Sequence, residues 1–320
     1  MVQKILLMGL NGAGKTTIVR HVLEGKELEE LDLSPTEGVK TDEYRYRRLV
    51  EISIFDCGGQ KQFIEAYFTA RMERTVFSNV RVFIWVLDAA DRKRVLDSRN
   101  WFKNAFQLLK KYSPKAKVFV LAHKYDLKDK LTKVELKNIF LETEPLPGVK
   151  YYTTSVKNKT ARRVLCKILD TLIEKTETER FKNIQKILDK LNNRLNAKLT
   201  MLINKEDGLE IASSIHPELS KKVTTKDATE FLQYLSIKTL IYPLTMVLKL
   251  VQQFRKNKFL ESKVLDITIF KFDREYIILK DIHKLISIFI ATHTTSASLD
   301  KIELEINKIS IKLLEILKLK

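Results

Sequence analysis

The stretch Gly9-Leu10-Asn11-Gly12-Ala13-Gly14-Lys15-Thr16 decides the fold of this 320-residue chain. An apolar segment, Lys4–Met8, precedes it, and an amphipathic segment, Thr16–Glu24, follows it. Two glycines separated by four residues, then Lys and a hydroxyl residue, let successive backbone N–H groups point at phosphate oxygens. The positive end of the following helix adds to this attraction. The sequence therefore predicts a phosphate-binding loop between a strand and a helix.

Each residue of this loop has an expected role toward a nucleoside triphosphate. Lys15 is expected to reach the β- and γ-phosphates, and the Thr16 hydroxyl to hold Mg²⁺. Further contacts with the phosphates are expected from Asn11, Gly12, Ala13, Gly14 and Thr17.

Residues 1–177 alternate apolar strands with amphipathic helical patterns. Phe83–Leu87 and Val118–Ala122 are continuously apolar, as are strands that are buried on both faces of a parallel sheet. This alternation predicts an α/β doubly wound sheet that binds its ligand at the carboxyl ends of the strands. We expect strands at Lys4–Met8, Glu51–Phe55, Val80–Leu87, Lys117–Ala122 and Val149–Thr154, and helices at Thr16–Glu24, Arg94–Lys111, Lys133–Glu142 and Ala161–Lys175.

Residues 178–320 follow a different pattern and predict a second, α+β domain. Apolar residues at three- and four-residue steps indicate a helix over 178–197, and Asp207-Gly208 indicates a hairpin between 198–204 and 209–215. An amphipathic helix with Ile302, Ile306, Ile309, Leu313 and Leu317 on one side ends the chain. Between the hairpin and this last helix we expect a helical segment at about 225–256 and strands at 264–272, 275–281 and 283–291.

Asp56-Cys57-Gly58-Gly59-Gln60 comes directly after the strand Glu51–Phe55. Asp56 is expected to lie near Mg²⁺, and the backbone N–H of Gly59 to approach the γ-phosphate because no side chain blocks it. Gln60 is expected to orient the attacking water. In this order and spacing after a phosphate loop, the pattern indicates hydrolysis of the nucleotide.

A third motif, His123-Lys124-Tyr125-Asp126, follows the buried strand Lys117–Ala122. Two adjacent N–H donors of guanine need a pair of acceptors, which the carboxylate of Asp126 supplies. The aliphatic part of Lys124 is expected to cover the base, and His123, where such motifs usually have Asn, to support the loop. In Thr154-Ser155-Val156, the backbone N–H groups of Ser155 and Val156 are expected to contact the guanine carbonyl.

Thr36 lies in the loop-like stretch Ser34-Pro35-Thr36-Glu37-Gly38. Its hydroxyl is expected to join Mg²⁺ while the γ-phosphate is present and to leave afterwards, as in an order–disorder switch. Thr41 is the alternative, and Pro35 and Gly38 favour Thr36 because they mark the loop.

The composition indicates in which compartment the protein works and which kinds of partner it binds. The two cysteines cannot form a disulfide framework, which indicates a reducing, cytoplasmic compartment. The net charge of +18 is spread along the chain without a cluster of five basic residues, so we expect no nucleic-acid partner. There is no stretch of 18 apolar residues, and Val2 stands where myristoylation needs glycine, so membrane association is expected only through partners or surface charge.

With these motifs placed, the first 175 or so residues resemble a Ras-superfamily GTPase. The phosphate loop, continued by Thr17, is similar to the Arf-like form. Three other stretches resemble the Rag/Gtr GTPases more closely. They are Asp56–Gln60 with Tyr67-Phe68-Thr69, Val76–Val80 through Val86-Leu87-Asp88, and Ser113–Lys117 leading to His123–Leu127, where His in place of Asn is typical of that family.

The Rag/Gtr resemblance implies a P-loop NTPase G domain, residues 1–177, followed by a roadblock-like dimerisation domain, residues 178–320. It implies GTP/GDP and Mg²⁺ as ligands, and pairing with a second Rag-like subunit as a homo- or heterodimer. It also implies a roadblock/longin-type scaffold at a membrane, a GAP and an exchange factor. Asn11 stands where many Ras-like loops have Gly, and we expect slow intrinsic hydrolysis. Two alternatives remain open: a nucleotide-locked scaffold subunit and an Arf-like traffic GTPase.

Overall fold

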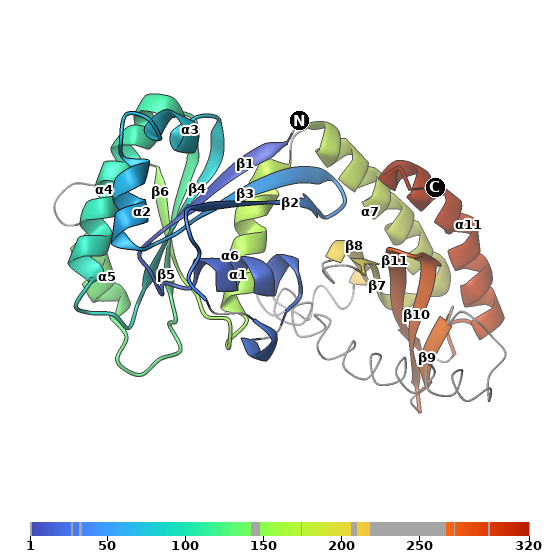
Figure 1. Cartoon of the computed structure of the whole chain (residues 1–320). Coiled ribbons are helices and arrows are strands. Elements are labelled where there is room, and N and C mark those ends of the chain that lie inside the picture. The colour runs from blue at the N-terminus through green and yellow to red at the C-terminus, as the bar shows by residue number, and fades with distance from the viewer. Residues whose placement is uncertain are drawn as a thin grey trace, which may run out of the picture. The chain divides into compact units, whose positions relative to one another are not determined.

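The computed structural model describes residues 2–26, 28–31, 34–141, 148–173, 175–205, 210–217, 267–271, 273–293 and 295–319. The chain divides into two compact units (Figure 1). The first consists of Met1–Tyr46 and Val50–Ile173, and the second of Arg47–Leu49 and Glu174–Lys320.

The first unit is built on a six-stranded sheet in the order β2-β3-β1-β4-β5-β6. Strand β2 runs antiparallel to β3, and the other strands run parallel to their neighbours. Because β3 and β4 lie on opposite sides of β1, the loop after β1 opens at the point where the strand order reverses, which is where such sheets bind ligands. The strands are Gln3–Met8 (β1), Val39–Tyr46 (β2), Val50–Cys57 (β3), Val80–Asp88 (β4), Lys117–His123 (β5) and Val149–Thr153 (β6).

Helices cover both faces of this sheet (Figure 1). Helix α1 packs against α6 on one face, and α4 packs against α3, α5 and β4 on the other. The helices are Lys15–Leu23 (α1), Lys61–Tyr67 (α2), Glu73–Phe77 (α3), Val95–Tyr112 (α4), Lys133–Leu141 (α5) and Thr160–Leu169 (α6), with short 3₁₀ turns at Leu28–Glu30 (η1) and Asp170–Leu172 (η2).

Aromatic side chains fill the core between β4 and α4. The rings of Phe83, Trp85 and Phe102 are fully buried and lie with their centroids 5.9–6.4 Å apart. The indole N–H of Trp85 donates to the hydroxyl of Ser98 (3.0 Å), so its one polar group is satisfied. This packing fixes the carboxyl end of β4, which carries part of the site.

The second unit has a five-stranded antiparallel sheet in the order β8-β7-β11-β10-β9. Helix α7 packs against β7 and β8, and α11 packs against α7 and β10. Its elements are Lys175–Leu195 (α7), Ala197–Asn204 (β7), Glu210–Ile215 (β8), Ile267–Lys271 (β9), Glu275–His283 (β10), Ile286–His293 (β11) and Leu299–Leu317 (α11). This is the α+β, roadblock-like arrangement that the sequence predicts.

The predicted fold class is confirmed, and four elements of the structure differ from the expectation. Strand β2 was not predicted because it is an edge strand whose alternating pattern is mostly polar and which pairs only with β3. The short helices α2 and α3 were not predicted either. The predicted strand at 283–291 begins later, at Ile286, because β10 extends to His283. The helical segment expected at 225–256, the hairpin tip 206–209 and Phe272 lie outside the described residues.

Candidate functional site

The phosphate loop connects β1 to α1 and encloses the amino group of Lys15. Lys15 is 6% exposed, and its Nζ donates to the carbonyl oxygens of Gly9 (2.9 Å) and Leu10 (3.1 Å). Burial lowers the pKa of Lys15, while the charge of Asp56 opposes this shift. The ammonium group is therefore held inside the loop, where a phosphate would compete with the carbonyls for it.

Two glycines are required by close packing around this loop. Gly14 has φ +91°, and a Cβ there would lie 2.5 Å from Cδ2 of His123. A Cβ on Gly59 would lie 2.4 Å from the backbone nitrogen of Asn11, whose N–H donates to the Gly59 carbonyl (2.8 Å). The segment after β3 therefore lies directly against the phosphate loop. Asn11 and Gly12 are exposed, Ala13 is buried, and Thr17 lies half-buried on α1.

Three oxygen-bearing side chains meet beside the loop. Oγ1 of Thr16 donates to Oδ2 of Asp56 (2.5 Å) and lies 2.9 Å from Oγ1 of Thr36, which itself lies 3.4 Å from Oδ2 of Asp56. Thr41, the alternative to Thr36, lies within β2, opposite Phe55. The predicted metal residues thus come together from three separate segments.

The chemistry of this cluster fits a magnesium ion. Oδ1 of Asp56 is buried and has no hydrogen-bond partner in the described part of the chain. Burial raises the pKa of Asp56, although the hydroxyl of Thr16 and the charge of Lys15 oppose this shift. One carboxylate with two hydroxyls is a ligand set of the hard, oxygen type that Mg²⁺ prefers, with room for phosphate and water.

Gln60 immediately precedes α2 and follows Gly59, which lies against the phosphate loop. Its Oε1 accepts a hydrogen bond from Nε2 of Gln62 (3.3 Å), so its side chain lies along the first turn of the helix. Gly38 connects the two neighbouring segments, because its carbonyl accepts from the N–H of Gly58 (2.7 Å) and from the hydroxyl of Tyr67 (2.6 Å).

His123 links the phosphate loop to the motif predicted to read the base. Its ring is 3% exposed, lies beside Gly14, and bonds through Nδ1 to Oγ1 of Thr154 (3.0 Å). Burial, together with the nearby charge of Lys124, lowers the pKa of His123 to about 4. The ring is therefore neutral at pH 7, and its position is that of a packing and hydrogen-bonding residue.

The side chain of Ser155 forms a hydrogen bond with the carboxylate of Asp126. Burial alone would raise the pKa of Asp126, but a hydrogen bond from Ser155 and the charge of Lys157 bring it below its usual range. The N–H of Ser155 donates to Oγ1 of Thr160 (2.8 Å), so a backbone contact from this segment to guanine would come from Val156.

The last residue of β4 and the segment after it contribute further charged residues that no sequence motif indicated. Asp88 accepts from Nζ of Lys124 (2.7 Å), and Asp91 holds Nε of Arg94 (2.6 Å). A guanidinium nitrogen of Arg94 would lie 3.9 Å from a Cβ at Gly12, so this side chain lies near the exposed part of the phosphate loop. These charged residues stand at the end of a buried strand, and the other motifs follow strands in the same way. This position in the sequence could have indicated that they lie at the site.

A phosphate loop after the first strand of a mainly parallel six-stranded sheet, beside an Asp–Thr–Thr cluster, defines the class: this is a small G protein fold of the Ras superfamily. A comparison with protein-family models identifies the family. Residues 4–234 match the Gtr1/RagA G protein conserved region. The chain therefore belongs to the Gtr1/RagA family, and the resemblance noted in the sequence is confirmed.

Characterised relatives agree with this assignment. The GTP-binding protein GTR1 of Saccharomyces cerevisiae is 30% identical over 220 residues, which are 66% of this chain and 69% of the relative. The Ras-related GTP-binding protein A of Dictyostelium discoideum is 31% identical over 180 residues, 54% of this chain and 58% of the relative. The ADP-ribosylation factor F of the same organism is 32% identical over 135 residues, 42% and 66% of the two chains. Similarity to both groups matches the mixed Arf and Rag character of the motifs.

Within the described residues, no helix is both long enough and apolar enough to cross a membrane.

Proposed function

We propose that this chain is a GTP/GDP switch that binds its nucleotide with Mg²⁺ through the first unit and hydrolyses GTP slowly. The observation that carries this proposal is the meeting of Thr16, Thr36 and Asp56 beside the buried Lys15. Thr36 belongs to a segment without regular secondary structure, so its position in the cluster would depend on whether Mg²⁺ and the γ-phosphate are bound.

The switch would act through two segments that are already joined. The 34–38 segment contributes Thr36 to the cluster, and Gly38 bonds to Gly58 in the segment after β3. A γ-phosphate contacted by the Gly59 N–H would hold the segment after β3 in place. The hydrogen bond between Gly58 and Gly38 would then hold the 34–38 segment as well. After hydrolysis both segments would lose the same anchor.

Hydrolysis would depend on position and charge rather than on a covalent intermediate. Mg²⁺, when bound, neutralises charge on the β- and γ-phosphates. Lys15 would bind the same phosphates, and Gln60 would orient the attacking water after leaving Gln62. We propose a slow intrinsic rate, because fast hydrolysis of this kind needs further positive charge at the transition state, which a GAP would supply, and an exchange factor would release the product GDP.

The base would be read by Asp126, with Ser155 holding its carboxylate and Val156 supplying an N–H. His123 would support both this motif and Gly14 without touching the base. The aliphatic part of Lys124 would cover the base while its Nζ stays on Asp88.

Identification of the nucleotide that copurifies with the full chain tests the proposal. We expect GDP or GTP, and affinity for guanine nucleotides well above that for adenine nucleotides. Gln60→Leu should abolish single-turnover hydrolysis while keeping affinity, and the matched control Gln62→Leu should hydrolyse GTP at nearly the wild-type rate. Equal rates in all three proteins would support a nucleotide-locked scaffold instead.

We further propose that residues 178–320 pair with a second Rag-like subunit, and that the dimer meets a roadblock/longin-type scaffold and reaches membranes through it. The apolar stripe on α11 is buried inside its own unit, so it is core. Leu304 and Ile311 on the same helix are 54% and 68% exposed and offer the apolar surface for pairing. Light scattering of the full chain should give twice the 37.3 kDa chain mass for a homodimer, and Ile311→Glu should return it to a monomer.

A further inference from the structure

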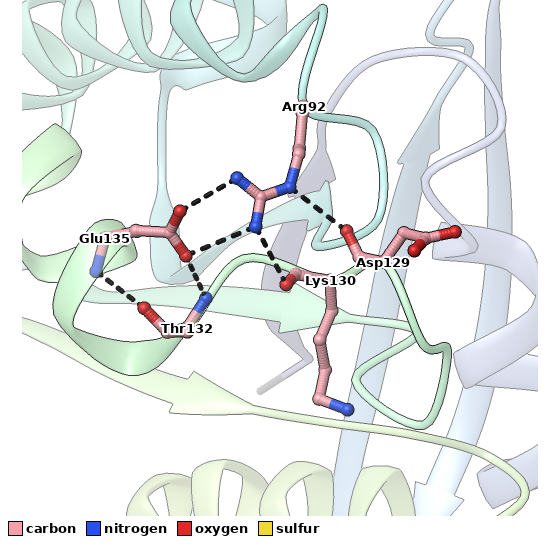
Figure 2. A network of polar contacts seen from close by, with 5 residues as sticks. All are labelled: Arg92, Asp129, Lys130, Thr132 and Glu135. Carbon is pink, nitrogen blue, oxygen red and sulfur yellow. Dashed lines mark hydrogen bonds and ion pairs between the residues drawn. The ribbon is translucent and has the colours of Figure 1, made fainter.

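Arg92 clamps the segment that follows the base-reading motif (Figure 2). Its Nε donates to the carbonyl of Asp129 (3.2 Å), and its Nη2 to the carbonyl of Lys130 (3.3 Å). Its Nη1 and Nη2 reach the two carboxylate oxygens of Glu135 at 2.8 and 3.4 Å. One planar guanidinium therefore fixes two carbonyls and a carboxylate at once, which Lys cannot do.

The carboxylate end of this clamp is itself fixed. Oε2 of Glu135 accepts from the N–H of Thr132 (2.6 Å), and Oγ1 of Thr132 accepts from the N–H of Glu135 (3.1 Å). This reciprocal pair is a capping box at the start of α5. Hydrogen bonds from Arg92 and Thr132 lower the pKa of Glu135 to about 2, so the carboxylate stays charged.

The 124–131 segment is also held by backbone hydrogen bonds to Ala89, which directly follows β4. The N–H of Ala89 donates to the carbonyl of His123 (2.8 Å), and the N–H of Leu131 donates to the carbonyl of Ala89 (2.7 Å). The pair Asp88–Lys124 holds the near end of the segment, and Arg92 holds the far end. Asp126 lies between these two attachments.

We propose that Arg92 is a positioning residue for guanine recognition, acting through the 127–132 segment to keep the carboxylate of Asp126 in place. The inference rests on the proposed guanine-binding function. An ion pair with side chains 52% and 38% exposed contributes little to global stability. The two backbone carbonyls can bond to water when Arg92 is removed, so the loss falls on the position of the segment rather than on the fold.

Arg92→Ala in the full chain separates these effects when GDP and IDP are compared. IDP lacks the exocyclic amino group, one of the two donors that Asp126 is expected to bind. We expect GDP release from the variant to be about fivefold faster, the GDP-over-IDP preference to fall by a similar factor, and the IDP release rate to change by less than about twofold. The melting temperature of the nucleotide-free protein and single-turnover hydrolysis of prebound GTP should stay near wild type.

Two further variants sharpen the result. Glu135→Gln keeps an acceptor for the capping box and should show the same direction of change, and the double variant should be no worse than Arg92→Ala alone. Lys111→Ala breaks another surface ion pair, with Glu73 (3.0 Å), outside this network and should leave release and selectivity unchanged.

Each outcome decides the matter. The positioning role would be overturned if Arg92→Ala released GDP at the wild-type rate, or if it released GDP faster with an unchanged GDP-over-IDP preference. Neither result would contradict the proposed guanine binding. If the wild-type chain shows no preference for guanine nucleotides over adenine nucleotides, the proposed function fails, and this inference fails with it.

Discussion

Acidification should destabilise the first unit through the buried ring of His123. Burial, reinforced by the charge of Lys124, lowers the pKa of His123 from 6.5 to about 4. The ring lies beside Gly14 and bonds to Thr154, so it has little room to admit the water that a charged imidazolium needs. The charged or titratable groups that act on it are Lys124, Asp126, Asp88 and His21.

The sign and the size of the effect follow from these two pKa values of His123. Between pH 6.5 and about 4 the unfolded chain binds more protons than the folded chain, so the free energy of unfolding falls as the pH falls. The shift of about 2.5 pH units corresponds to about 3 kcal/mol in total, of which about 2 kcal/mol is lost by about pH 5. Above pH 6.5 the contribution is complete.

Tryptophan fluorescence isolates this effect, because the chain has two tryptophans, Trp85 and Trp101, and both lie in the first unit. Urea unfolding of the wild type and of His123→Asn should be compared at pH 7 and pH 5. Asn keeps a hydrogen-bonding group but does not titrate, so the difference between the two proteins should change by about 2 kcal/mol. The same difference at both pH values, or an NMR titration of His123 near pH 6.5, would refute the reasoning.

Three further predictions concern other parts of the chain. Asp56→Asn should remove the magnesium dependence of nucleotide retention, so that EDTA, which should speed GDP release from the wild type, has little effect on the variant. Gly59→Ala places a Cβ 2.4 Å from the Asn11 nitrogen and should weaken GTP binding more than GDP binding in equilibrium titrations; equal losses would argue against a γ-phosphate contact. Leu188→Ala removes a fully buried side chain of α7 and should cost about 2–5 kcal/mol in the second unit, visible by circular dichroism while tryptophan fluorescence and GDP affinity stay unchanged.

Much of the fold could be predicted because its determinants are local. The continuously apolar runs of β4 and β5 predict buried parallel strands, and the glycine spacing of the phosphate loop predicts its backbone. Strand β2 could not be predicted in this way, because only pairing with β3 makes its polar residues a strand. The same holds for α2 and α3, which are too short to show a clear helical period.

Some residues of the candidate site could also be predicted from the sequence, and others could not. Lys15, Asp56 and Asp126 could be predicted, because binding phosphate, metal and base each requires a particular residue type within a recognisable motif. The sequence left Thr36 and Thr41 as alternatives, and only the folded chain brings one of them, Thr36, to within 2.9 Å of Thr16. The distance depends on how the 34–38 segment lies against the residues that follow β3, where the N–H of Gly58 donates to the carbonyl of Gly38, and no local pattern encodes this contact.

The sequence by itself determined the phosphate loop, because two glycines, a lysine and a threonine at fixed spacing are a backbone requirement that holds within eight residues. Only the tertiary structure decided that Arg92 meets Glu135, 43 positions later, and that His123 packs against Gly14. These contacts arise when β1, β4 and β5 become neighbours and their following loops converge at one edge of the sheet. Isolated charged residues show no periodicity, so their partners are fixed only by strand order.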